Sequence, residues 1–114
     1  MSTIKDKNLA TIGQQEVDWA ARQMKVLEEI KTEFSSSKPL NGLNIGACMH
    51  VTKETANLML TLKAAGANVA LCASNPLSTK DSVAAYLSEN DIEVHAVHGV
   101  SNDDFFKHLN SVLD

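Results

Sequence analysis

The stretch that decides the fold is Leu43–Ala73, LNIGACMHVTKETANLMLTLKAAGANVALCA, because it holds two apolar runs on either side of a helical segment. The runs at 43–49 and 68–73 are short and mainly apolar, which is typical of buried parallel strands. Between them, residues 53–65 place apolar side chains on one helical face, and Gly66 follows where helices often end in a left-handed residue. The stretch therefore predicts a strand, a helix and a second, parallel strand.

The same alternation continues toward the C-terminus. Residues 78–89 predict a second helix, 92–97 a third strand and 102–112 a third helix. We therefore expect an α/β fold, with a parallel βαβαβα unit over residues 43–113 in three layers, of the Rossmann or flavodoxin type, with right-handed crossovers. The third strand alternates apolar and polar residues, which predicts that it is the less buried strand and lies near an edge of the sheet.

A helical segment precedes this unit. Residues 14–36 repeat apolar side chains at spacings of three and four, which predicts one long N-terminal helix that braces or covers the unit. Ser35-Ser36-Ser37-Lys38-Pro39 ends it, because the proline disfavours helix at the residue before it. We expect residues 1–12 to be a flexible N-terminus and residues 13–114 to form one partial domain.

Composition excludes several classes of function. The net charge is −4, whereas a surface for nucleic acid or for an anionic membrane needs clustered Lys and Arg. No apolar run approaches the roughly 18 residues that span a bilayer, and Met1–Lys7 has no apolar signal region. Cys48 and Cys72 lie in apolar runs, where we expect reduced and buried thiols. These features predict a cytoplasmic protein that binds neither nucleic acid nor membrane.

Two polar junctions follow the first two predicted strands. His50 and Thr52, with Glu54 in the next helical turn, follow the first strand, and Ser74–Asp81 follows the second. Open α/β sheets bind small ligands at the carboxyl ends of their strands, so the two junctions predict one ligand site. His50 is a candidate acid–base residue at this junction. The plainer alternatives are a loop hydrogen bond for His50, a helix N-cap for Thr52 and a helix-dipole contact for Glu54.

The remaining polar residues have plain alternatives too. Asn75 with Pro76 is also typical of a turn, and Ser78 of a helix cap. The other histidines, His95, His98 and His108, are expected to be solvated. No two histidines show helical metal-ligand spacing, so no metal is expected. No G-x-G-x-x-G or phosphate-loop motif is present, so this chain is not expected to bind a dinucleotide by itself.

Three motifs carry a family resemblance. H-V-T-K-E-T-A at residues 50–56 resembles the H-[ML]-T-x-E-T-A motif of the S-adenosylhomocysteine hydrolase (adenosylhomocysteinase) family. S-N-P-L-S-T-K-D at 74–81 and K-P-L-N-G at 38–42 resemble two further motifs of that family, in the same order. The similarity covers nearly the whole chain and is closest to the archaeal and bacterial branch. Lys80 departs from it, because the family usually has Gln there.

The resemblance implies part of a substrate-binding domain. The family reversibly splits S-adenosylhomocysteine into adenosine and homocysteine, using a tightly bound NAD. By resemblance, His50 is a catalytic residue beside the ribose 5′ region, and Thr52 and Glu54 bind the adenine side. The neighbouring pocket wall is expected to contain Asn75, Ser78 and Thr79.

The resemblance also implies what the chain needs from elsewhere. We expect an N-terminal portion of the enzyme, inactive alone and completed by a missing C-terminal part that binds NAD. We expect a homo-oligomer, because a truncated sheet exposes a strand edge. Two alternatives stay open: a stand-alone adenosine-binding module without turnover, and a flavodoxin-like interaction domain without a ligand. A response-regulator receiver is a weaker variant of the second, because Cys48-Met49-His50 lacks clustered acids.

Overall fold

A computed structural model describes residues 2–114 of the chain. Its elements alternate between helices and strands after an all-helical N-terminal part. They are η1 (Lys7–Leu9), α1 (Ala10–Ala21), α2 (Lys25–Ser37), β1 (Asn44–Cys48), α3 (Lys53–Ala64), β2 (Asn68–Cys72), α4 (Asp81–Glu89), β3 (Glu93–His95) and α5 (Asn102–Leu113).

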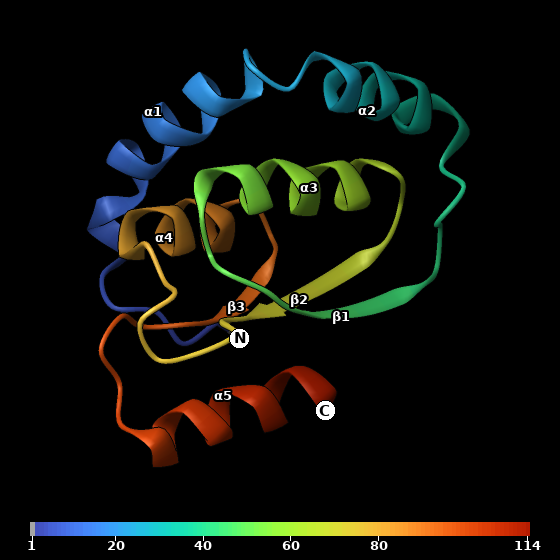
Figure 1. Cartoon of the computed structure of the whole chain (residues 1–114). Coiled ribbons are helices and arrows are strands. Elements are labelled where there is room, and N and C mark those ends of the chain that lie inside the picture. The colour runs from blue at the N-terminus through green and yellow to red at the C-terminus, as the bar shows by residue number, and fades with distance from the viewer. Residues whose placement is uncertain (1) are drawn as a thin grey trace.

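The three strands form one parallel sheet in the order β1-β2-β3. Ala47 is paired with Leu71, and Leu71 with Val94. Helices α3 and α4 cover one face of the sheet, α5 covers the other, and α1 and α2 lie across α3 and α4 (Figure 1). The α/β class, the parallel sheet and the βαβαβα order are confirmed.

The core lies between the sheet and the layer of α3 and α4, and it continues between these two helices and α1. Its largest fully buried side chains are Met59, Leu71, Leu87, Ile92, Val17, Val51, Val83, Val94 and Cys72. Small side chains such as Ala56 and Ala84 let the helices approach the sheet closely. Gly66 follows α3 with φ of 102°, a left-handed conformation that glycine adopts without a Cβ clash. None of the described helices is both long enough and apolar enough to cross a membrane.

Residues 14–36 form parts of two helices where the sequence predicted one. The chain turns between α1 and α2, and Met24 has φ −117° and ψ 58°, outside the helical region. Both helices pack on α3, so their apolar side chains keep one spacing across the turn. The sequence pattern therefore could not show the break.

The N-terminal segment is paired with the sheet, which differs from the expected flexible end. Thr3 N donates to Val94 O at 2.8 Å, and Ala96 N donates to Thr3 O at 2.9 Å. This parallel bridge places Thr3 beside His95, along the outer edge of β3.

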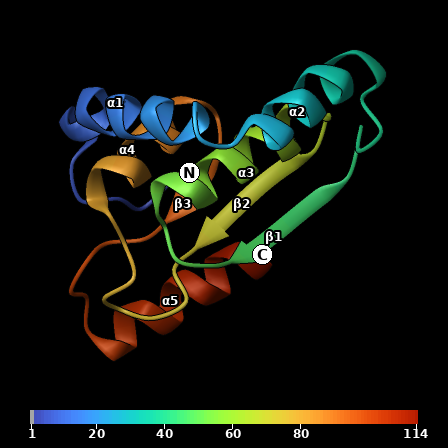
Figure 2. The same ribbon diagram turned by 45° about the horizontal axis from the view of Figure 1, so that its top comes forward.

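The prediction that the third strand is the less buried one is wrong, although it does lie at an edge of the sheet. Val94 and His95 of β3 are buried, whereas β1 alternates between exposed and half-buried residues. The N-terminal segment covers the outer edge of β3, and no element lies beside the outer edge of β1 in the described part of the chain (Figure 2). Burial depends here on contacts between segments far apart in the sequence, which periodicity does not record.

Two further predictions of solvent exposure are wrong, those for two histidines and for Cys48. His95 and His108 are buried, and the ring of His95 lies 2.9 Å from Glu93 Oε1 through Nε2 and 3.2 Å from Thr3 Oγ1 through Nδ1. Cys48 is exposed, whereas Cys72 is buried as expected and burial raises the pKa of its thiol to about 12.

The close crossing of α1 and α4 depends on Gly13. A Cβ at this position would lie 1.9 Å from Ser82 O, in the backbone of α4. We predict that Gly13→Ala lowers the free energy of unfolding by about 3 kcal/mol, although alanine favours a helix over glycine. Urea denaturation measures the change, and Gln14→Ala, at an exposed position on the same helix, is the control. A stabilised Gly13→Ala protein would contradict this crossing.

The buried His108 predicts a loss of stability in mild acid. Burial lowers the pKa of His108 below its ordinary value, and the nearby His95 lowers it further. Below about pH 6.5 the unfolded chain therefore binds a proton that the folded chain resists, so the free energy of unfolding falls as the pH falls. We expect His108→Leu to flatten this dependence between pH 7 and 5 in urea titrations. The exposed His98→Gln is the control, and an unaltered slope in His108→Leu would disprove the assignment.

Candidate functional site

The loops that follow the three strands lie together at one end of the sheet, where the strands finish (Figure 1). Val51 N donates to Ser78 O at 2.8 Å, and Lys80 N donates to Val51 O at 2.9 Å. These bonds form a parallel bridge between Val51 and Thr79, beyond the ends of β1 and β2. The two polar junctions predicted from the sequence are therefore joined backbone to backbone at one edge of the sheet.

The third loop is tied to the second. Gly99 N donates to Pro76 O at 2.8 Å, and His98 N donates to Asp81 Oδ1 at 3.0 Å. All three strand-to-helix loops thus form one connected rim at the carboxyl ends of the strands.

The side chain of His50 is exposed at this rim and contacts the second junction. Its Nδ1 lies 2.7 Å from Ser74 Oγ, and Ser74 Oγ lies 3.3 Å from Ser78 Oγ. Nε2 of His50 makes no hydrogen bond to any residue from 2 to 114. The ring therefore has one nitrogen held by the protein and one open to a ligand. Ser74 was not singled out by the sequence reasoning, although a hydroxyl directly after a buried strand was the available signal.

Thr52 and Glu54 sit at the start of α3. Thr52 is the N-cap, and its side chain accepts a hydrogen bond from Thr55 N, so the plain capping role is present. Glu54 occupies the first turn, where the helix dipole stabilises a carboxylate. Its nearest charged partner is Lys53 Nζ at 4.0 Å, a long contact. Because the side chain is 56% exposed, its carboxylate is open to a ligand.

The second junction is a compact turn. Asn75 Oδ1 accepts from Leu77 N at 2.8 Å, and Ser78 Oγ accepts from Asn75 N at 3.1 Å. Ser78 does not cap the second helix, because α4 begins at Asp81 and not at residue 78. Thr79 is 93% buried, since only 7% of its surface is exposed, and its Oγ1 has no hydrogen-bond partner within residues 2–114.

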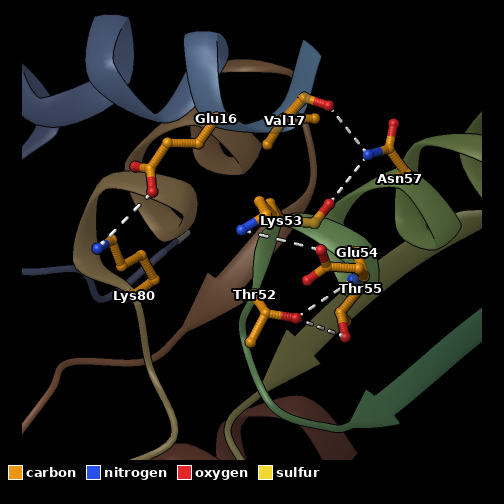
Figure 3. A network of polar contacts seen from close by, with 8 residues as sticks. All are labelled: Glu16, Val17, Thr52, Lys53, Glu54, Thr55, Asn57 and Lys80. Carbon is orange, nitrogen blue, oxygen red and sulfur yellow. Dashed lines mark hydrogen bonds and ion pairs between the residues drawn. The ribbon is translucent and has the colours of Figure 1, made fainter. Parts of the chain in front are cut away.

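Helix α1 braces both junctions (Figure 3). The carboxylate of Glu16 lies 3.7 Å from Lys80 Nζ and accepts from Ser82 Oγ at 2.5 Å. The ring of Trp19 lies 5.3 Å from Lys53 Nζ, a cation–π contact. A hollow of about 370 Å³ is lined by Gln15, Glu16, Trp19 and Lys53. The long helix predicted as a brace thus acts through its first half, which contacts one lysine from each junction.

The rim residues fit neither a metal nor a dinucleotide. No group of three or more His, Cys, Asp or Glu residues that could hold a metal ion is found in the part of the chain that the structure describes. The turns at residues 49–52 and 73–80 contain no glycine, whereas a bound pyrophosphate needs a glycine-rich turn for close backbone approach.

Comparison with known proteins gives consistent matches along the whole chain. The model of the S-adenosyl-L-homocysteine hydrolase family matches residues 1–114. The adenosylhomocysteinase of Saccharolobus solfataricus is 50% identical over 110 residues, which are 96% of this chain and 26% of that protein. The enzymes of Aquifex aeolicus and Pyrococcus abyssi are 50% and 44% identical over 97% of the chain. The chain spans about a quarter of the length of these relatives.

The stability of a Thr79 variant tests whether its buried hydroxyl lacks a hydrogen-bond partner. A buried hydroxyl without a partner destabilises the fold, so we predict that Thr79→Val raises the free energy of unfolding by about 1 kcal/mol. Urea denaturation without ligand measures this, and Thr32→Val, exposed on α2, is the control. A destabilised Thr79→Val protein would mean that the hydroxyl has a partner in solution.

Proposed function

The chain belongs to the S-adenosyl-L-homocysteine hydrolase family, and we propose that it forms one wall of that enzyme's nucleoside site. The observation that carries the proposal is the bridge between Val51 and Thr79. It holds the exposed side chains of His50, Glu54 and Asn75 at the same edge of the sheet. This edge is where open α/β folds bind small ligands.

Glu54 and Thr52 are proposed to recognise the adenine base. The exocyclic amine of adenine is a donor, and the exposed carboxylate of Glu54 is an acceptor. A hydrogen bond to a charged group contributes about 1.5–3 kcal/mol, enough to select an amine over a carbonyl at this position of the base. The hydroxyl of Thr52 is half-buried, and its oxygen caps α3 while its proton is donated to Thr55 Oγ1 over a long 3.4 Å contact. A ring nitrogen of adenine is a stronger acceptor to which this proton can turn.

His50 is proposed to move the proton at the 5′ end of the nucleoside. Splitting or forming the bond at this carbon requires a proton to leave water or reach sulfur. The neutral imidazole accepts the proton from water, and the protonated ring donates it to sulfur. The open Nε2 of His50 is the atom for this transfer. Asn75 and Ser78 shape the adjacent wall, and Thr79 supports it from behind because its side chain is buried.

The complete reaction needs parts that lie outside these residues. A transient oxidation of the ribose would be the chemistry of NAD held by residues other than these. We therefore propose hydrolysis of S-adenosylhomocysteine for the whole enzyme only. That enzyme would include a C-terminal partner segment and would be a homo-oligomer. The exposed outer edge of β1 supports association with a further segment.

A second candidate is adenosine binding without turnover. The features that favour it are the donor and acceptor groups of Thr52 and Glu54, which need neither NAD nor a second acid–base residue. Measuring adenosine binding and hydrolysis in the same preparation separates the two functions.

Adenosine titration tests the proposed wall. We predict that Glu54→Gln weakens adenosine binding about tenfold in calorimetry, because the charged hydrogen bond is lost. Glu89→Gln, the same change at an exposed position at the far end of α4, is the matched control. Equal affinities for Glu54→Gln and the unaltered protein, or unmoved amide resonances of residues 49–55 at saturating adenosine, would rule out this wall.

A further inference from the structure

Ser74 joins the candidate acid–base residue to the second junction. Cys48 is paired with Cys72, and Met49 N donates to Cys72 O at 3.0 Å. The same offset of 24 residues sets His50 opposite Ser74, whose oxygen lies 2.7 Å from His50 Nδ1. The contact lies between the β1–β2 pairing and the Val51–Thr79 bridge, so backbone hydrogen bonds hold the chain on both sides of it.

The protons available in this chain of hydroxyls restrict the ring of His50. Ser78 donates its hydroxyl proton to Asn75 O at 3.0 Å and accepts from Asn75 N at 3.1 Å. A hydroxyl has one proton, so with the proton of Ser78 on Asn75 O the 3.3 Å contact between Ser78 and Ser74 is a hydrogen bond only where Ser74 donates. Ser74 then has no proton left for the ring.

It follows that the 2.7 Å contact is an N–H donated from His50 Nδ1 to Ser74 Oγ. We propose that Ser74 is a positioning residue, which holds the neutral ring of His50 in the Nδ1-protonated form and leaves the lone pair on Nε2. In a neutral imidazole one nitrogen carries the proton, and the hydrogen bonds of the ring decide which one. Here the bond at Nδ1 decides it. In this form the open nitrogen accepts a proton, so His50 is a base toward water bound at the rim.

This inference rests on the proposed acid–base role of His50, yet its test needs no nucleoside. Nitrogen-15 shifts of labelled histidine distinguish a protonated from an unprotonated ring nitrogen. At a pH where the ring is neutral, we expect His50 to show a protonated Nδ1 and an unprotonated Nε2. The His50→Gln protein assigns the signals by their loss. An Nε2-protonated ring in the unaltered protein would overturn the proposal.

Variants of the hydroxyl chain separate positioning from plain support of the fold. In Ser74→Ala the two nitrogen shifts should move toward a common average, because neither tautomer is held, and Ser74→Thr should restore them. Ser78→Ala frees the proton of Ser74 to point at Nδ1, so it should move the ring proton toward Nε2. Ser36→Ala, exposed on α2, is the control that should change nothing. Unaltered shifts in both Ser74→Ala and Ser78→Ala would overturn the proposal.

Activity gives an independent reading in the complete enzyme. We expect Ser74→Ala to lower kcat about tenfold with little change in KM, because general-base assistance is weakened while nucleoside contacts remain. The pH profile should shift in Ser74→Ala and return in Ser74→Thr. If the tautomer test fails while Glu54→Gln still weakens adenosine binding, only the role of Ser74 is lost. If adenosine does not bind while the nitrogen shifts behave as expected, the nucleoside wall is lost and the tautomer assignment stands.

Discussion

The backbone pairing of Val51 with Ser78 and Lys80 is the constraint on which the candidate site depends. It continues the sheet for one step past the ends of β1 and β2, where the chains would otherwise separate into their helices. Val51 itself is fully buried, so the pairing is protected from water and is costly to break. Without it, His50 and Ser74 would have no common register, and the two polar junctions would be independent loops.

The brace formed by α1 works on the same two loops from the outer layer. Its contacts with Lys53 and Lys80 are partly exposed, and surface contacts of this kind contribute little stability each. The close approach at Gly13 and the buried Val17 and Ala20 are what attach the helix. The charged contacts therefore orient the two lysines at the rim, whereas packing holds the helix in place.

Burial divides the polar residues of the rim into two groups. His50, Glu54 and Asn75 are exposed, and these three have groups available to a ligand. Thr79 is enclosed, and its hydroxyl faces no partner among the described residues. A family motif read as a row of binding residues thus contains side chains that face in different directions, because Asn75 lies in a turn whereas Thr79 lies in the bridge to Val51.

The sequence by itself determined the α/β class, the order of the elements from residue 43 and the two polar junctions, since apolar period and junction chemistry are local properties of the chain. It placed His50, Thr52, Glu54, Asn75 and Ser78 at strand-to-helix junctions, and the structure sets them at one rim. The tertiary structure alone decided the break between α1 and α2, the burial of His95 and His108, the exposure of β1 and the contact between Ser74 and His50. Each of these depends on which distant segment packs beside the residue, as Thr3 does beside His95, and no local spacing encodes that choice.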